Sequence, residues 1–342
     1  MDIKEIKDKA RKLMNNACRV CPVCDGRVCS GEVPGMGGSG SGASFRNNVS
    51  ALGAVRLNTR LVHSVHNPVL ESEFLGIKLD LPIMIGPIGG VAFNLGDAMP
   101  EAEYAEAIVA GAKASGIIAG VPDGALLSII ETALGCVQKS GGHGIPFLKP
   151  WAAEEFEQKV AMSVKAGCTV VGSDLDGIGM ITLRKMGRHV YAKNPEGLKE
   201  MADIAHKHKA RFVIKGIMSV EDAVACMEAG VDAIIVSNHG GRVLDYTPGT
   251  AEVLPAIAAS VKGRMGIIGD GGVRSGVDVL KMLALGADCV MIGRPYSIAA
   301  IGGGVEGVQL YTQTYRDQLE QAMIMTGCAD VSQAGPHLLY KG

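Results

Sequence analysis

The chain has 342 residues, a formal net charge of −2, and a composition that is 47% hydrophobic but only 4% aromatic. This length can bury one large core or two ordinary ones, and the near-zero charge offers no general attraction for nucleic acid or an anionic membrane. The first 13 residues are charged and amphipathic rather than a signal peptide, and no apolar run reaches membrane-spanning length. We therefore expect a cytoplasmic protein that binds neither nucleic acid nor a membrane.

Four cysteines follow this predicted N-terminal helix. Cys18, Cys21, Cys24 and Cys29 form a C-x2-C-x2-C-x4-C pattern among Pro, Gly and Ser residues. In a cytosolic protein, thiols this close in sequence indicate metal binding or redox chemistry rather than disulfides. The first three have the spacing of bacterial ferredoxins, although the fourth comes one residue late. An iron–sulfur cluster, a structural zinc ion and free or redox-switching thiols all stay open as interpretations.

A Gly/Ser-rich connector over residues 30–44 follows the cysteines, and we place a domain boundary at its end. Residues 1–44 then form an N-terminal extension with one helix and the Cys-rich segment. Residues 45–342 form one larger domain.

Eight short apolar runs recur along the larger domain, at residues 81–86, 116–120, 145–149, 169–173, 211–215, 233–237, 266–269 and 289–292. Stretches with helical spacing lie between them, at residues 101–114, 153–166, 195–209, 220–229 and 277–285. Apolar strands that alternate with helices in this way predict an α/β protein with a closed (β/α)8 fold, a TIM barrel. The alternative is an open doubly wound sheet, but residues 86–90 (GPIGG) are not the glycine fingerprint that such sheets carry after their first strand.

In such a barrel, ligands bind where the strands end. Seven of the eight residues at those positions are polar or charged, and the set is Pro87, Asp123, Lys149, Asp174, Lys215, His239, Asp270 and Arg294. A rim that served stability alone would not concentrate such side chains. We therefore expect the active site at this rim.

The most informative strand end lies at residues 234–245 (IIVSNHGGRVLD). A buried strand delivers its last residues to the rim, where His239 can move a proton and Arg242 can hold an anion. Gly240 and Gly241 have no side chains, so a flat ligand can approach the backbone closely there. The simpler interpretation is a helix-capping turn after a core strand.

Glycine-rich turns follow the last two strands, at residues 269–274 (GDGGVR) and 292–295 (IGRP). In barrels, the loops after these two strands commonly bind a phosphate group through backbone N–H groups and a helix N-terminus. An arginine in each turn adds charge-assisted hydrogen bonds. The pair of turns therefore predicts a phosphate site.

Four motifs, taken in order, resemble the family of FMN-dependent α-hydroxy-acid oxidases and dehydrogenases, which includes glycolate oxidase, lactate oxidase and L-lactate dehydrogenase. They are residues 215–217 (KGI), 237–245 (SNHGGRVLD), 270–274 (DGGVR) and 293–295 (GRP). The likeness runs from about Phe45 to Gly327.

The resemblance implies an FMN site made by Pro87, Ile88, Gly89, Lys149, Lys215, Ser237, Asp270, Gly271, Gly272, Arg274, Gly293 and Arg294. The glycines and arginines of the last two turns would bind the phosphate, and Lys215 would stabilise the anionic reduced flavin ring. His239 matches the catalytic base, Asp174 the carboxylate that orients it, and Arg242 the residue that binds the substrate carboxylate.

The resemblance also implies a reaction, the oxidation of a 2-hydroxy acid to a 2-oxo acid. His239 would take the hydroxyl proton while the Cα hydrogen passes to flavin N5 as hydride. Abstraction of the Cα proton to give a carbanion is the competing mechanism. An iron–sulfur cluster beside the flavin would carry single electrons to an acceptor other than O2, such as an electron-acceptor protein. The resemblance further implies a homo-oligomer, a tetramer or larger.

The substrate side of the site departs from the family pattern. The family's two active-site tyrosines fall here near Pro34 and at Trp151, and Lys149 replaces a flavin-contacting glutamine. The segment after Asp174 is too short for the long lid of the oxidases. A second substrate arginine has no counterpart at its own position, so the candidate substrate-binding residues besides Arg242 are Trp151, Arg184 and Arg188.

These departures leave two other classes of function open. One is an FMN-dependent isomerase like the type 2 isopentenyl diphosphate isomerases, which uses the barrel and the flavin without net oxidation. The other is a non-catalytic flavin- or phosphate-binding sensor, although such a protein has no need for a histidine–aspartate pair.

Overall fold

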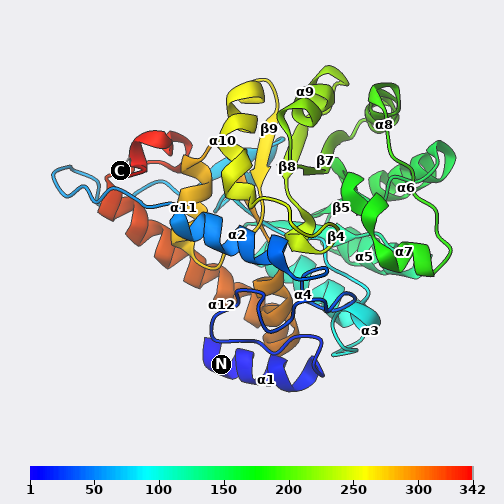
Figure 1. The fold of residues 1–342 in the computed structure, drawn as a ribbon, viewed down its shortest axis with the longest axis horizontal. Coiled ribbons are helices and arrows are strands. Elements are labelled where there is room, and N and C mark those ends of the chain that lie inside the picture. The colour runs from blue at the N-terminus through cyan, green and yellow to red at the C-terminus, as the bar shows by residue number, and fades with distance from the viewer. Residues whose placement is uncertain (341–342) are drawn as a thin grey trace.

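The computed structural model describes residues 1–340, and its centre is a closed barrel of eight parallel strands in the order β10-β3-β4-β5-β6-β7-β8-β9 (Figure 1). The strands are β3 (Ile83–Ile85), β4 (Ile118–Pro122), β5 (Ile145–Leu148), β6 (Val170–Asp174), β7 (Arg211–Ile217), β8 (Ala233–Val236), β9 (Gly266–Gly269) and β10 (Cys289–Ile292). The predicted TIM barrel is therefore confirmed, and each predicted strand coincides with an observed one to within a few residues.

Helices follow the strands and cover the outside of the barrel. They are α3 (Val91–Asn94), α4 (Glu101–Ala114), α5 (Leu127–Lys139), α6 (Ala153–Lys165), α7 (Ile181–Lys185), α8 (Pro195–Lys207), α9 (Val220–Glu228), α10 (Thr250–Val261), α11 (Gly276–Ala284) and α12 (Arg294–Thr326). The strands are apolar throughout because both of their faces are buried. One set of side chains fills the barrel, with Met84 and Phe147 among them, and the other set packs against the helices.

An antiparallel hairpin of β1 (Ser72–Phe74) and β2 (Ile77–Leu79) closes the end of the barrel opposite the strand ends. Phe74 belongs to the cluster of side chains that fills the barrel, and its ring lies against Gly266 at the start of β9. The open end is therefore the carboxyl end of the strands, where ligands bind in this fold.

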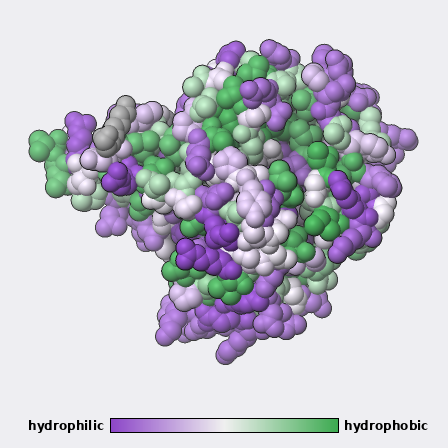
Figure 2. Space-filling view, viewed as in Figure 1, coloured by the Kyte–Doolittle hydropathy of each residue, from purple (hydrophilic) through white to green (hydrophobic). Residues whose placement is uncertain are grey.

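The N-terminal extension runs along the barrel and then over its open end. Helix α1 (Ile3–Leu13) buries Ile6 and Ala10 against α12, and a Cβ added at Gly302 of α12 would come 2.2 Å from the Ile6 carbonyl oxygen. The outer face of α1 is hydrophilic (Figure 2). The chain then passes through the four cysteines to α2 (Ala43–Ala54), and the Ser39 N–H donates to the Gly241 carbonyl over 2.8 Å. This segment is thus attached directly to the predicted catalytic loop.

Short 3-10 turns make up the rest of the regular structure: η1 (Leu175–Gly179), η2 (His239–Gly241), η3 (Val331–Gln333) and η4 (Pro336–Leu338). Two of them, η1 and η2, follow strands at the open end of the barrel. None of the helices within residues 1–340 combines the length and the apolar character that crossing a membrane requires.

Candidate active site

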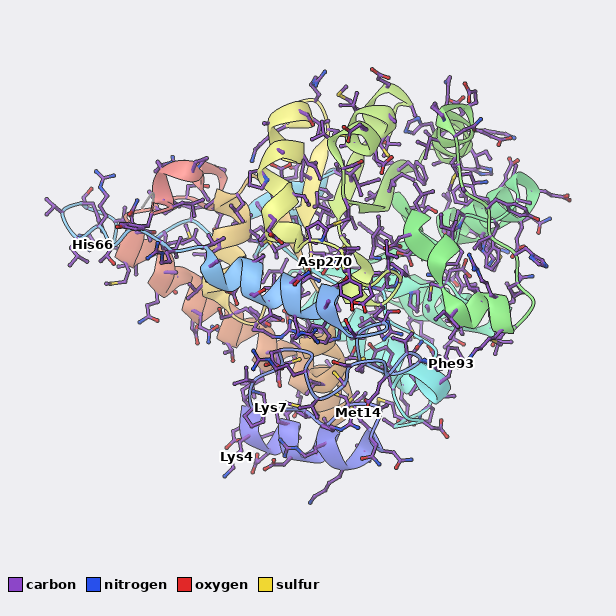
Figure 3. All side chains as sticks on the ribbon, viewed as in Figure 1. Lys4, Lys7, Met14, His66, Phe93 and Asp270 are labelled. Atoms are coloured by element: carbon purple, nitrogen blue, oxygen red, sulfur yellow. The ribbon has the colours of Figure 1, made fainter. Side chains whose placement is uncertain are left out.

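A cavity of about 1140 Å³, its open mouth included, lies at the carboxyl end of the barrel strands. Thirteen of the residues predicted from the sequence line it: Pro87, Ile88, Gly89, Lys149, Lys215, His239, Arg242, Asp270, Gly271, Gly272, Arg274, Gly293 and Arg294. Figure 3 shows Asp270 near the middle of the molecule, between β9 and α2, and the glycines that follow it lie against Asn48 of α2.

His239 begins η2 directly after β8 and is held from two sides. Its N–H donates to the Ser237 hydroxyl over 3.0 Å, and its Nδ1 lies 3.0 Å from a carboxylate oxygen of Asp176. Nζ of Lys215 lies 3.0 Å from the same Nδ1. When Nδ1 carries the proton and donates it to Asp176, the lone pair of Nε2 is free to accept a proton. The arrangement is that of a general base with an orienting carboxylate.

The carboxylate that bonds to His239 is thus Asp176 and not Asp174, which corrects the predicted pairing. A carboxylate oxygen of Asp174 lies within 4.8 Å of the imidazole but makes no hydrogen bond to it. Asp174 instead forms buried ion pairs with Lys149 and Lys215. The physical reason is the tight turn η1, which follows β6 and brings the carboxylate two residues further along to the imidazole.

The four charged groups around His239 form one buried network. Burial alone would raise the pKa of Asp174, but Lys149, Lys215 and His239 lower it well below its usual range. Burial would lower the pKa of Lys215, whereas Asp174, Asp176 and Asp270 raise it above its usual range. Burial would likewise raise the pKa of Asp176, but His239 and, to a smaller extent, Lys215 lower it below its usual range. Both carboxylates and the Lys215 ammonium are therefore charged at neutral pH.

Three guanidinium groups, those of Arg242, Arg274 and Arg294, meet at the other end of the cavity. None of them has a carboxylate partner among the described residues. Arg294 donates to the carbonyl oxygens of Met36 and Gly240, over 2.7 and 3.0 Å. Arg242 donates to the Gly35 carbonyl and, over 3.0 Å, to the side chain of Asn94. Such a group of cations suits an anionic ligand.

The pKa values of these arginines reflect the same crowding. Burial, followed by repulsion from Arg294, lowers the pKa of Arg242 to about 10. Burial, followed by repulsion from Arg274, lowers the pKa of Arg294 to about 10. The Nε atom of Arg274 is buried and has no hydrogen-bond partner within residues 1–340. A bound anion would relieve all three effects.

The backbone around the arginines also fits a phosphate group. Gly271 and Gly272 have φ angles of +98° and +83°, so only glycine adopts this turn without strain. A Cβ at Gly272 would lie 2.5 Å from the Asn48 carbonyl oxygen. Gly293 precedes the N-terminus of α12, where free N–H groups favour an anion. The residues present therefore fit the phosphate of FMN.

Besides Asp174, four residues predicted for this site do not line the cavity. Ser237 is fully buried and its hydroxyl donates to Asp270 over 2.6 Å, so it positions its neighbours rather than facing a ligand. Trp151 was expected at the substrate, which is wrong in this structure. Its indole N–H donates to the buried Asp123 over 2.6 Å, and the cations of Lys159 and Arg188 each lie 4.3 Å from the centre of its ring.

The two candidate arginines of the segment after β6 also point elsewhere. Arg188 pairs with Glu155 on α6, and Arg184 is exposed and donates to the Ile178 carbonyl. Their predicted contact with substrate is therefore wrong in this structure. The same segment instead presents Met180, Thr182, Leu183 and Met186 to the cavity.

Sequence reasoning did not identify several residues of the site. Asp176 had a detectable signal, because it lies two residues beyond a strand-end aspartate in a glycine-rich turn. Asn94 and Phe93 on α3 had none, since nothing in a short helical stretch shows that it borders a cavity. The apolar residues from Met180 to Met186 read as an ordinary amphipathic turn.

Comparisons with known proteins agree with this geometry. A model of the FMN-dependent dehydrogenase family matches residues 35–199 and 181–341. An L-lactate oxidase from Lactobacillus jensenii is 32% identical over 362 residues, covering 97% of this chain and 83% of that protein. A glycolate oxidase from Spinacia oleracea is 30% identical and covers 85% of each chain. The crystal structure of a mandelate oxidase superposes with a TM-score of 0.80 at 25% identity, covering 99% of this chain and 97% of that one.

Proposed function

The chain belongs to the FMN-dependent dehydrogenase family, and we propose that it oxidises a 2-hydroxy acid to the 2-oxo acid with His239 as the base. The observation that supports this most directly is the His239–Asp176 pair, at 3.0 Å, in a cavity that also holds Arg242. The cavity combines a base, an anion-binding group and a phosphate site, and an inert binding protein has no use for the first of these.

The residues that would hold FMN are at two sides of the cavity. Gly271, Gly272, Arg274, Gly293 and Arg294 would bind its phosphate, and Lys215 would supply positive charge to the ring. FMN bound there supplies a two-electron acceptor for hydride. Lys149, in place of an amide, adds a second ammonium that is anchored on Asp174.

His239 would remove the hydroxyl proton of the substrate at Nε2 while Asp176 holds Nδ1. The negative charge of Asp176 stabilises the imidazolium that forms, and the buried surroundings strengthen this attraction. Arg242 would bind the substrate carboxylate, for which its planar guanidinium is well suited. Met180, Leu183 and Met186 give the cavity an apolar wall, so we propose an apolar substituent on the substrate.

Anaerobic mixing of the FMN-loaded protein with 2-hydroxy acids tests this function. We expect the flavin absorbance near about 450 nm to bleach with the right substrate. The His239→Gln variant should keep its flavin but bleach at least 100-fold more slowly, since general base catalysis contributes about 10²–10⁴-fold. An isomerase or a sensor would leave the flavin oxidised, so absence of bleaching across a broad panel of hydroxy acids would overturn the proposal.

Two further proposals concern the electron acceptor and the oligomeric state of the protein. We propose that electrons leave the flavin through the N-terminal cysteine segment to an electron-acceptor protein. We also propose a homo-oligomer, which the projecting loop that carries His66 supports (Figure 3), because Leu61 and Val62, a few residues before His66, are 68% and 93% exposed. Light scattering coupled to size-exclusion chromatography measures the oligomeric state, and a monomer at micromolar concentration would contradict it.

A further inference from the structure

A second cavity, of about 1520 Å³ with its open mouth included, lies between the Cys-rich segment and helices α1, α2 and α12. All four cysteines of the predicted metal motif line it: Cys18, Cys21, Cys24 and Cys29. Lys7, which Figure 3 shows on α1, borders the same cavity. The remaining five cysteines of the chain lie elsewhere. The sequence motif thus becomes one site in space.

The cysteine cavity and the candidate active site share a wall. Met36, Arg274 and Arg294 line both of them. Nη2 of Arg274 lies 3.4 Å from Sγ of Cys24 and 3.2 Å from the Cys24 carbonyl oxygen. The arginines that fit the flavin phosphate are therefore also the neighbours of the thiols.

We propose that Cys18, Cys21, Cys24 and Cys29 hold an iron–sulfur cluster of the [4Fe–4S] type, placed beside the flavin site. The role of this cluster in electron transfer rests on the proposed function, whereas the presence of the cluster does not. The thiols are not close enough together to form a preassembled site for a single zinc ion, and a cluster accepts a wider spacing. Four thiolates on one tetrahedral zinc at about 2.3 Å must lie about 3.8 Å apart, whereas within residues 1–340 no three of these sulfur atoms lie within 4.8 Å of one another. A cluster distributes its four ligands over four irons and so needs the wider spacing.

The surroundings of the thiols also suit a cluster. Four thiolates on a cluster carry net negative charge, and the cavity offers Arg274, Arg294 and Lys7 against it. The Val20 N–H donates to Sγ of Cys18 over 3.4 Å. Among the described residues, the N–H groups of Cys21, Cys24 and Cys29 donate to no protein acceptor and are available to cluster sulfur. Hydrogen bonds of this kind are one of the means by which proteins set cluster potentials.

The position of the site indicates its role as an electron relay. The thiols lie between the flavin cavity and the outside, because Val23 and Val28 in the same loop are 72% and 60% exposed. For each 2-hydroxy acid oxidised, two electrons pass one at a time from the flavin through the cluster to two molecules of a one-electron carrier protein. The two hydrogens of the substrate are released as protons to the solvent. The balance requires no oxidant besides that carrier.

Iron and acid-labile sulfide analysis of the anaerobically purified full chain tests the proposal, with anaerobic reconstitution by iron and sulfide where the metal has been lost. We expect about four of each per chain and an electron paramagnetic resonance signal after dithionite reduction. The Cys24→Ser and Cys21→Ser variants should lose the signal and most of the iron. The matched control is Cys136→Ser, a partly buried cysteine on α5 outside the cavity, which should keep both.

Three outcomes would overturn the proposal. They are one zinc per chain without iron, no iron or sulfide after reconstitution, and iron that persists in both Cys21→Ser and Cys24→Ser. Circular dichroism and FMN content show whether a variant has folded. Failure of the cluster is distinguishable from failure of the proposed function. A protein without iron whose flavin is bleached by a 2-hydroxy acid rejects the cluster alone, while one with iron and an unresponsive flavin rejects the function alone.

Discussion

Nδ1 of His239 lies 3.0 Å from a carboxylate oxygen of Asp176 and 3.0 Å from Nζ of Lys215. One ring nitrogen therefore faces a carboxylate anion and an ammonium cation at once. The single proton on the neutral ring is drawn to Nδ1 by Asp176, while the Lys215 ammonium favours a bare Nδ1. Anything that changes the balance between these two neighbours changes which ring nitrogen is free to act as the base.

Replacing the orienting carboxylate tests this balance. We expect Asp176→Asn to lower the rate of flavin reduction by about 10- to 100-fold, a part of the 10²–10⁴-fold that a general base contributes. The amide cannot stabilise the imidazolium, and its N–H2 group favours the wrong tautomer. Stopped-flow flavin bleaching across pH measures the rate. A loss that is equal at all pH values, with no change in the shape of the profile, would assign Asp176 a merely structural role.

Removal of one partner from the buried Lys149–Asp174 pair is expected to destabilise the fold. Lys149→Met leaves Asp174 with Lys215 as its remaining cation, and breaking a buried pair costs about 3–5 kcal/mol. Urea unfolding measures the loss. The Lys149→Met/Asp174→Asn double variant should lose less free energy of unfolding than the sum of the two single variants, because it removes both charges and leaves neither unpaired. Strict additivity would show that the pair is not coupled.

The barrel was predictable because its strands are buried on both faces and so are apolar without interruption. The bounds of β9 and β10 match the predicted ranges for this reason, and the bounds of α4 match the range predicted from its helical spacing. Helix α12 was not predictable, since Gly302, Gly303 and Gly304 interrupt its pattern, and Gly304 has a φ of +59°. Gly302 and Gly303 make sense only with Ile6 of α1 packed against them, which is a tertiary contact.

The active site likewise contains residues that could be predicted from the sequence and residues that could not. The turns after β9 and β10 were identifiable because a phosphate site needs glycines and arginines at fixed places. The partner of His239 was not, because the local turn η1 decides whether Asp174 or Asp176 reaches the imidazole. Trp151 could not be placed either, since its position depends on the buried Asp123 that accepts its N–H.

The protein should lose stability in acid because Asp174, in the charged network around His239, becomes protonated. The pKa of Asp174 in the folded state lies below its value in the unfolded chain, so the unfolded chain takes up the proton first as the pH falls. The contribution is complete above about pH 4 and is lost progressively below it. We expect the free energy of unfolding to decline more steeply between about pH 4 and pH 2 in the wild type than in Asp174→Asn. Asp317→Asn, at an exposed position, is the control and should follow the wild type.

Discrimination between FMN and riboflavin tests the phosphate end of the cavity. Arg274 has a buried Nε without a partner, and Gly271 and Gly272 next to it form a backbone turn open to an anion. We expect Arg274→Met to weaken FMN binding by about 10- to 100-fold, since a hydrogen bond to a charged group contributes about 1.5–3 kcal/mol. Riboflavin lacks the phosphate, so its affinity should stay the same in this variant.

Fluorescence titration of the apoprotein measures both affinities. The surface variant Arg264→Met controls for loss of charge and should bind both flavins as the wild type does. Among the described residues, the Arg264 guanidinium donates only to the Ser260 carbonyl. Because Arg274 also contacts Cys24, iron content is measured in the same samples. An equal loss of affinity for FMN and riboflavin would show that Arg274 supports the cavity as a whole and does not bind the phosphate.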